Sequence, residues 1–421
     1  MRAVTEPSQE VPVVAEVDVA VVGGGTAGIG AALGAARAGA RTLLVEAHGS
    51  LGGQMTLGQV NMIPGDWDYE VGSPTYGGVM TELVTRLRQE EAYWPRERLT
   101  KEFKRFDIEV CKWVAIDLLE AAGVQMRLHS WASNAIVKDG RIEAVMLDSV
   151  AGRQAVVARS FVDTSGDAML AHFAGASYET GTMGISLEGT AFMPDLSAFQ
   201  TFVEGLGQPF HEWLRAHGQP VHIGGSVNER TPQLMHISRT LPDPGLMSGD
   251  IDGLDVAVLT QVENQCRRDL KEALDFLRAR VPGCRNMILV DTRPHLGVRS
   301  TRRVVGDYAV TREDMTQRTR FDDCVVRSGT PDGYYEIPYR ALYSRDLANL
   351  WVAGRCFSST HEAQTGLRII PTCVATGEAA GTAAALAAKQ GCTARDLETD
   401  ALVSQLVKQG VALREETARL P

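Results

Sequence analysis

Two regions of the chain, one near each end, alternate apolar strand patterns with helical patterns. VDVAVV (Val17–Val22) is a short β-branched run typical of a buried parallel strand. A glycine-rich turn follows it, then small residues that predict a helix ending at Gly39, then a second strand in RTLLVEA (Arg41–Ala47). Near the C-terminus, NLWVAG (Asn349–Gly354) predicts a strand, and Ile370–Lys389 predicts a glycine- and alanine-rich helix with the loop before it. The pattern therefore predicts α/β structure at both ends of the chain.

The pattern between these regions changes near residue 177. Before it, helical spacing covers Val79–Glu91 and Phe106–Gly123, and five short β-rich runs follow: VQMRL, SNAIV, AVMLD, QAVVA and SFVDT. Asp139-Gly140 predicts a hairpin between two of these runs. From about Ser177 to Tyr343 the α/β rhythm is lost, although a helix is predicted around Leu259–Arg280.

Composition describes a globular chain of roughly two to four domains. The 421 residues are 44% hydrophobic and 22% charged, which excludes a disordered chain. A net charge of −10, with no lysine- or arginine-rich block, argues against a nucleic acid partner. The seven cysteines include no CxxC pair, which argues against a disulfide framework, a metal site and an iron–sulfur cluster. We therefore expect a reduced, cytoplasmic protein.

The N-terminal region predicts neither a targeting segment nor a membrane segment. Its first seventeen residues lack a basic start followed by an apolar core, so we expect residues 1–16 to form a flexible tail. Val19–Ala36 is an uncharged run of eighteen residues, which is long enough to span a membrane. Its six glycines, in a strand–turn–helix unit led by Asp18, explain it better, and we expect no membrane partner.

Glycines mark the clearest chemical feature of the sequence. Ten of the 42 lie between Gly23 and Gly53, and the first of these form the turn Gly23-Gly24-Gly25-Thr26-Ala27-Gly28. In a dinucleotide fingerprint, Gly23, Gly25 and Gly28 would allow a tight turn, close approach of a pyrophosphate and close packing of helix on strand. Glu46 ends the second strand, where a carboxylate accepts hydrogen bonds from a ribose diol. A purely structural glycine turn would not require Glu46, so we predict a bound dinucleotide.

Three segments resemble known flavoproteins. Gly52-Gly53-Gln54, shortly after Glu46, resembles the extended signature of two-domain FAD proteins. NLWVAGRCFSSTHEAQTGLRIIPTCVATGEAAGTAAALA resembles the closing FAD motif of the glutathione-reductase-type superfamily. FVDTSGDAMLAHFAGASYETG (Phe161–Gly181), with GVRSTRRVVGDY and IPYRALYSRDLANLWVAGR, resembles the FAD-dependent oxidoreductase family related to fumarate reductase flavoproteins.

The resemblance implies FAD as the cofactor. It also implies an α/β fold in which a Rossmann-like FAD-binding domain of the three-layer ββα type carries an inserted α+β substrate domain. The FAD domain would comprise residues 17–176 and 344–395, the substrate domain residues 177–343, and a C-terminal helical tail residues 396–421. The N-terminus of the final helix, at Gly377–Gly381, would point at the pyrimidine end of the flavin. The expected FAD-binding residues are Gly23, Gly25, Thr26, Ala27, Gly28, Glu46, Ala47, Gly52, Gly53, Gln54, Ser165, Gly166, Asp167, Gly354, Arg355, Gly377, Ala379 and Ala380.

Missing motifs narrow the flavoprotein class. The sequence has no CxxxxC pair and no second GxGxxG turn, which disfavours a disulfide reductase supplied by NAD(P)H. Gly166-Asp167-Ala168 lacks the proline and glycines that follow this motif in aromatic hydroxylases, which disfavours a monooxygenase of that type. His48 lies four residues before Gly52, which is not the spacing of a histidyl-linked flavin, so covalent attachment is unsupported.

The candidates for substrate chemistry are first His361, Arg368, Arg299 and Arg302, and beside them Glu362, Arg303 and His295. The resemblance implies that a histidine and an arginine near the flavin bind a substrate carboxylate, although His361 and Arg368 are spaced further apart here. An imidazole can also move the proton that accompanies hydride transfer. On a helix, Arg299 and Arg302 would share one face and suit an anion. The alternatives are a hydrogen-bonded structural histidine and an ion-pair cluster with acids such as Asp307.

We therefore expect an FAD-dependent oxidoreductase that transfers a hydride between the flavin and a small organic substrate, with an anionic substrate as one hypothesis. The alternatives are a flavin-dependent monooxygenase or tailoring enzyme, an electron-transfer flavoprotein subunit and a plain NAD dehydrogenase. The sequence leaves open the substrate, the direction of the reaction, the electron acceptor and the oligomeric state, a homo-oligomer included.

Overall fold

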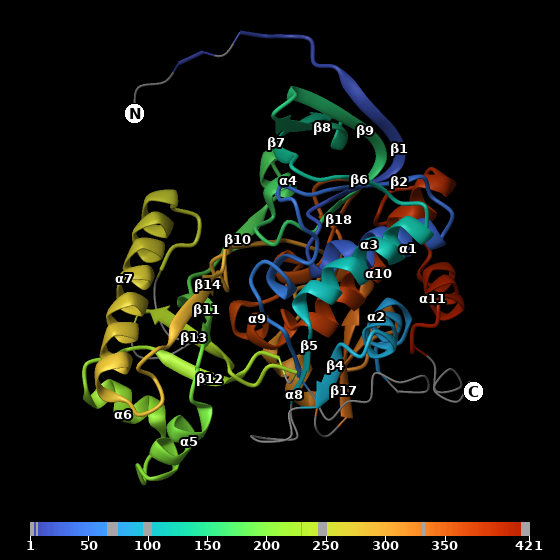
Figure 1. The fold of residues 1–421 in the computed structure, drawn as a ribbon. Coiled ribbons are helices and arrows are strands. Elements are labelled where there is room, and N and C mark those ends of the chain that lie inside the picture. The colour runs from blue at the N-terminus through green and yellow to red at the C-terminus, as the bar shows by residue number, and fades with distance from the viewer. Residues whose placement is uncertain are drawn as a thin grey trace.

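The computed structural model describes residues 4–5, 7–64, 75–95, 103–228, 230–242, 251–330 and 333–413 (Figure 1). Its central sheet contains a parallel set of strands in the order β6-β2-β1-β9-β18. These strands are β1 Val13–Val22, β2 Thr42–Val45, β6 Gln125–Arg127, β9 Gly152–Asp163 and β18 Leu350–Val352. Both ends of the chain thus contribute strands to one sheet, and the predicted α/β fold is confirmed.

Strand β1 is longer than the sequence pattern predicted. It begins at Val13 rather than Val17, and its first residues already pair with β9, Val13 beside Ala155 and Glu16 beside Val157. Residues 13–16, which we expected in a flexible tail, therefore belong to the sheet.

The runs QAVVA and SFVDT form one strand, β9, rather than two. The first half of β9 pairs with β8 (Arg141–Ser149), which pairs in turn with β7 (Trp131–Lys138), and its second half pairs with β18. The predicted hairpin between β7 and β8 is confirmed. Asp139 (φ 50°) and Gly140 (φ 71°) both have positive φ values, as a two-residue type I′ turn requires.

Helices α1 (Thr26–Arg37) and α10 (Ile370–Gln390) pack backbone against backbone. A Cβ atom built on Gly377 would overlap the carbonyl oxygen of Ala27, and one on Gly381 would overlap the carbonyl oxygen of Ala31. In return, a Cβ atom on Gly30 would overlap the carbonyl oxygen of Val374. The glycines and alanines of these helices therefore let the helix that follows the glycine turn lie directly on the helix near the C-terminus.

The protein has two hydrophobic cores. The first surrounds the central sheet, and the second is formed by residues from the sequence segment Ile185 to Val298. It contains the antiparallel sheet β12-β13-β11-β14 and the long helix α7, which packs on β11, β13 and β14. Figure 1 shows α5, α6 and α7 on one side of the molecule, away from the central sheet. The bounds are β11 Ile185–Phe192, α5 Leu196–Glu204, α6 Phe210–Ala216, β12 His222–Ser226, β13 Leu234–Leu241, α7 Val256–Arg280 and β14 Ile288–Thr292.

Two short antiparallel strands, β10 (Tyr178–Thr180) and β15 (Arg302–Val304), flank the segment that builds this second core. Apolar residues from Val304 to Tyr343 pack in the first core together with the central sheet. The segment of the chain that forms the second core is therefore shorter than the predicted substrate domain, residues 177–343. The domain boundaries themselves stay a prediction.

The remaining elements include two further antiparallel sheets, β3-β5-β4 and β16-β17. The bounds of the remaining elements are β3 Met62–Pro64, α2 Gly78–Gln89, β4 Tyr93–Pro95, β5 Phe103–Phe106, α3 Ile108–Ala121, α4 Met169–Phe173, α8 Arg312–Gln317, β16 Cys324–Thr330, β17 Gly333–Pro338, α9 His361–Leu367 and α11 Thr399–Lys408. In the described ranges no single helix is long and apolar enough to cross a membrane, and α9 with α10 satisfies that test only as a pair bent by 98°.

Glu378 is a buried carboxyl group in the middle of α10. Its Oε2 accepts the Val79 N–H at 2.9 Å and so caps α2, while Oε1 has no hydrogen-bond partner among the described residues. Burial raises the pKa of Glu378 to about 8. The folded protein therefore holds this proton more tightly than the unfolded chain does, and stability is lost as the pH rises from about 4.5 to about 8.

Replacing this carboxyl by an amide, Glu378→Gln, should remove that loss. We expect the difference in melting temperature, variant minus wild type, to increase by a few degrees between pH 5 and pH 9. The reason is that the wild type loses up to about 1.4 kcal/mol of unfolding free energy for each pH unit in the window. Thermal unfolding of both proteins across this pH range tests the prediction, with Glu120→Gln, at an exposed glutamate of α3, as control. A difference that does not change with pH would contradict it.

Candidate cofactor and substrate site

The glycine turn after β1 has the geometry of a phosphate-binding turn. Gly23 has a φ value of +105°, and a Cβ atom on Gly28 would overlap the Gly23 carbonyl oxygen, so helix and turn are in direct contact. Gly25 immediately precedes α1 and faces open space: among the described residues, a Cβ atom built on it would meet only Gly53 Cα, at 4.0 Å. The first N–H groups of α1 have no acceptor within the helix, so this open space suits a phosphate.

The second glycine pair is built onto the first turn. Gly52 N–H donates to the Gly24 carbonyl at 2.8 Å, and Gly52 forms a bridge with Gly25. Gly52 (φ +99°) and Gly53 (φ +52°) both lie in the left-handed region that favours glycine. The next residue, Gln54, donates its side-chain amide to the Leu296 carbonyl at 2.9 Å and so ties this turn to the middle of the chain.

Glu46 is buried beside the same turn. Its Oε2 accepts the Gly24 N–H at 2.6 Å, and its Oε1 accepts the His48 N–H at 2.8 Å. Each carboxylate oxygen keeps a second lone pair, so these bonds orient the group without using its full capacity. The structure thus brings Glu46, with the half-buried Ala47 next to it, to the turn formed by Gly23–Gly28. The role of Glu46 toward a ribose stays a prediction.

The predicted segments Ser165–Asp167 and Gly354-Arg355 meet at the ends of β9 and β18. Arg355 donates to Asp167 Oδ1 at 2.7 Å and to Thr301 Oγ1 at 2.9 Å. Gly354 (φ +73°) lies against Ala27 of the glycine turn, because a Cβ atom there would come within 2.8 Å of the Ala27 Cβ. Three motifs that are far apart in the sequence therefore form one site.

The predicted helix start at Gly377 is wrong. Helix α10 begins at Ile370, so Gly377, Ala379 and Ala380 lie buried in its middle, and Gly377 contacts Ala27 of α1. Pro371 near the start of the helix is the signal that would have placed its N-terminus correctly, because proline is favoured in the first turn. If α10 points its positive end at the cofactor, residues 370–373 provide that end.

The prediction that Arg299 and Arg302 share one face of a helix is also wrong. Arg302 lies in strand β15, donates to the Asp167 carbonyl at 3.1 Å and stacks over Tyr178. Arg299 lies before the strand and donates to the Gly184 carbonyl at 2.7 Å and to Ser186 Oγ at 3.1 Å. The guanidinium group of Arg302 thus lies beside Asp167, and among the described residues the hydrogen-bond acceptors of Arg299 are uncharged.

The proposed ion-pair partner Asp307 is engaged elsewhere. It accepts two hydrogen bonds from Arg395, at 2.5 and 2.7 Å. Two other acids are near these arginines: Glu179 lies 3.5 Å from Arg303, and the charge of Glu188 acts on Arg299. An ion-pair cluster of Arg299 and Arg302 with Asp307 is therefore excluded.

Arg368 differs from these arginines because its charge is not neutralised. It caps the C-terminus of α9, and in the described part of the chain its side chain has no hydrogen bond or ion pair; the buried Nε atom has no acceptor. Burial, together with the positive charges of Arg299 and Arg355, lowers its pKa to about 10. A partly desolvated cation among other cations is a site for an anion.

His361 begins α9, two helical turns before Arg368. Its Nδ1 lies 3.5 Å from Ser300 Oγ, at the limit of a hydrogen bond. Gly181 lies against both groups, and a Cβ atom built on it would come within 2.6 Å of His361 Nδ1. His361 is therefore weakly held rather than locked by a strong partner.

Two contacts of the site were not predicted from the sequence, although His295 itself was a candidate residue. His295 Nε2 lies 2.6 Å from His48 Nε2, and burial, followed by the charge of His48, lowers the pKa of His295 to about 4. Gln364 is buried in α9, donates to the Arg355 carbonyl at 3.0 Å and leaves its Oε1 without a described partner. No sequence signal pointed to Gln364, since the helix that carries it was not predicted.

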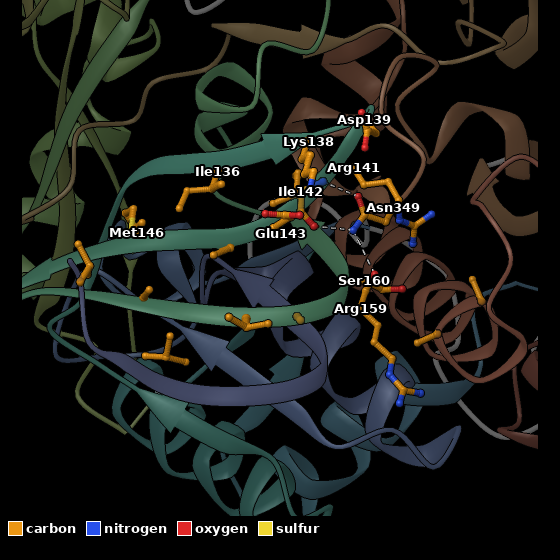
Figure 2. Close-up of a pocket in the computed structure, with 18 of the residues that line it drawn as sticks. Ile136, Lys138, Asp139, Arg141, Ile142, Glu143, Met146, Arg159, Ser160 and Asn349 are labelled. Atoms are coloured by element: carbon orange, nitrogen blue, oxygen red, sulfur yellow. Dashed lines mark hydrogen bonds between the residues drawn. The ribbon is translucent and has the colours of Figure 1, made fainter. Parts of the chain in front are cut away.

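A cavity of about 900 Å³ lies away from this site (Figure 2). It is lined by β7, β8 and β9, the N-terminal segment and the C-terminal end of α10. In Figure 2, Asn349 joins two strands there, donating to the carbonyls of Ile142 (2.9 Å) and Arg159 (3.1 Å). Its lining includes none of the predicted FAD-binding or catalytic residues, so this cavity is not the candidate active site.

The family of the chain follows from its match to known sequences. A profile of the FAD dependent oxidoreductase family matches residues 18–406, so the chain belongs to this family and is an FAD-dependent oxidoreductase. No curated protein sequence matches it significantly. The open turn at Gly25 and the free helix N-terminus beside it fit FAD as the cofactor.

Solved structures agree with the fold. The chain is similar to p-nitrophenol 4-monooxygenase PnpA from Pseudomonas putida DLL-E4, at 13% identity and a TM-score of 0.50, over 96% of this chain and 88% of that one. It is also similar to a geranylgeranyl bacteriochlorophyll reductase-like protein from Thermoplasma acidophilum, at 14% identity and a TM-score of 0.49, over the same shares, 96% and 88%. At such identities the likeness to PnpA shows a shared fold and nothing finer.

Two glycine variants separate the roles of the turn. Gly25→Ala places its methyl group in open space, so we expect the FAD-free protein to keep its melting temperature while the affinity for FAD falls about tenfold or more. Gly28→Ala should instead lower the stability of the FAD-free protein, because its methyl group overlaps the Gly23 carbonyl. Calorimetry of the apoproteins and FAD titration measure both effects; a Gly25→Ala variant with wild-type FAD affinity would contradict the assignment.

Proposed function

We propose that this FAD-dependent oxidoreductase transfers a hydride between its flavin and a small carboxylate substrate. The observation that carries the proposal is Arg368, a half-buried cation with no described partner beside Arg299 and Arg355. A carboxylate would neutralise it and accept from its guanidinium group through paired hydrogen bonds. When bound, FAD supplies the two-electron acceptor for a C–H bond whose hydrogen leaves as hydride while a neighbouring O–H or N–H proton is lost.

The other residues of the site would orient this anion and move its proton. Arg355 is already paired with Asp167, so its charge is largely compensated. Arg299 donates to uncharged oxygens and is close enough to Glu188 for that carboxylate to offset part of its charge, so it adds weaker attraction for the anion than Arg368 does. His361 lies on the same helix as Arg368 and faces Ser300 with Nδ1, which leaves Nε2 as the atom to take or return the substrate proton.

The relation to the glutathione-reductase-type superfamily and to fumarate reductase flavoproteins is part of this proposal. It is supported by the order of the motifs, since Gly23–Gly28, Ser165–Asp167 and Gly354-Arg355 meet at one site. The alternative, a flavin-dependent monooxygenase or tailoring enzyme, is supported by the fold shared with PnpA. The two differ in their co-substrates, since a monooxygenase must consume oxygen and an external reductant.

Anaerobic reduction of the holoenzyme tests the proposal. We expect flavin absorbance to be lost with members of a panel of small organic acids, and not with the corresponding amides or esters. In Arg368→Gln the acid concentration for half-maximal reduction should rise about 10- to 100-fold, as expected for loss of a charged hydrogen bond of about 1.5–3 kcal/mol. Arg312→Gln, at an exposed arginine, is the control and should behave as the wild type.

Two results would overturn the proposal. If neutral and acidic compounds reduce the flavin equally well, Arg368 is not an anion site. Substrate-dependent oxygen consumption that requires NAD(P)H, with no anaerobic reduction by any acid, would establish the monooxygenase alternative.

A further inference from the structure

One face of α9 carries three polar side chains in a helical row. His361, Gln364 and Arg368 are three and four residues apart, which places them along one stripe of the helix. The last two are incompletely satisfied: in the described ranges, neither Gln364 Oε1 nor Arg368 Nε has a hydrogen-bond partner, and both atoms are buried. One is an acceptor and the other a donor, so the row offers a ligand two different bonds.

The orphaned oxygen of Gln364 is held in place rather than free to turn away. The Gln364 side chain is 1% exposed, and its amide nitrogen donates to the Arg355 carbonyl at 3.0 Å. Because the nitrogen is committed to that bond, Oε1 is the atom left to face a ligand. A buried acceptor without a partner costs about 1–3 kcal/mol, so a ligand that donates to it recovers this energy.

The charges around His361, Gln364 and Arg368 determine which hydrogen-bond donor a ligand can present to Gln364. Arg299 and Arg355 both lie near enough to Arg368 to affect its ionisation, so the surroundings are positive. An ammonium group would be repelled there, whereas a neutral hydroxyl would not. Residues four apart on a helix have Cβ atoms about 5–6 Å apart, which suits a hydroxyl within one or two carbons of a carboxylate.

We propose that Gln364 is a specificity-determining residue whose Oε1 accepts a hydrogen bond from the hydroxyl group of a hydroxy acid whose carboxylate is bound by Arg368. This inference rests on the proposed function and narrows it: the substrate is a small hydroxy acid, and the enzyme discriminates against acids that lack the hydroxyl group.

Matched acid pairs test the inference. We would titrate the oxidised holoenzyme anaerobically with lactate and propionate, malate and succinate, and 3-phenyllactate and 3-phenylpropionate, and record the concentration for half-maximal change in the flavin spectrum. In the wild type, the hydroxy member of at least one pair should bind about tenfold or more tightly than its deoxy partner, because a site with a buried acceptor rejects a ligand without the donor.

The variants Gln364→Leu and Gln364→Met should reduce that ratio to about one. Both also lose the bond to the Arg355 carbonyl, but this affects the two members of a pair equally, so the ratio isolates the contact with Oε1. Arg368→Gln should weaken both members of every pair and leave the ratio largely unchanged.

The outcomes separate this inference from the proposed function. If no acid of either kind binds or reduces the flavin, both are wrong. If acids bind through Arg368 but hydroxy and deoxy partners bind equally in the wild type, or if either folded Gln364 variant keeps the wild-type ratio, the role of Gln364 is wrong and the carboxylate site stands.

Discussion

The close contact between α1 and α10 is the constraint on which the site depends. Gly30 and Gly34 on one helix, and Gly377 and Gly381 on the other, remove the side chains that would hold the two backbones apart. Because α10 lies directly on α1, the strand end at Gly354 comes to rest against Ala27 of the glycine turn. Residues separated by more than 300 positions thus form one surface, and the rest of the site is arranged around it.

The middle of the chain closes this surface from the other side. Its contacts reach several parts of the site: Leu296 accepts a hydrogen bond from Gln54, His295 lies against His48, and Thr301 bonds to both Asp167 and Arg355. Within this polar frame most arginines have oxygen partners close by. Arg368 is half-buried and has no such partner among the described residues, and this difference in pairing, rather than the number of arginines, is why we propose it as the anion site.

The sequence predicted the parts of the site that depend on local backbone chemistry. The glycine turn, Glu46 and Gly52-Gly53 lie together as their spacing suggested, because close backbone approach restricts these positions to glycine. Predictions that depended on the course of the chain failed. Arg302 lies on a strand rather than a helix, and α10 begins seven residues before Gly377. Gln364 could not be found at all, since its importance arises from an unfilled hydrogen bond that only the packed structure reveals.

The central claim is that Arg368 binds the carboxylate of the substrate beside the cofactor. The most direct measurement is a crystal structure of the FAD-bound protein, prepared anaerobically with an acid that binds but does not reduce the flavin. The account predicts carboxylate oxygens within hydrogen-bond distance of the Arg368 guanidinium group, on the face of α9 that carries His361 and Gln364. A carboxylate bound elsewhere, or an Arg368 side chain paired with a protein carboxylate in that structure, would contradict it.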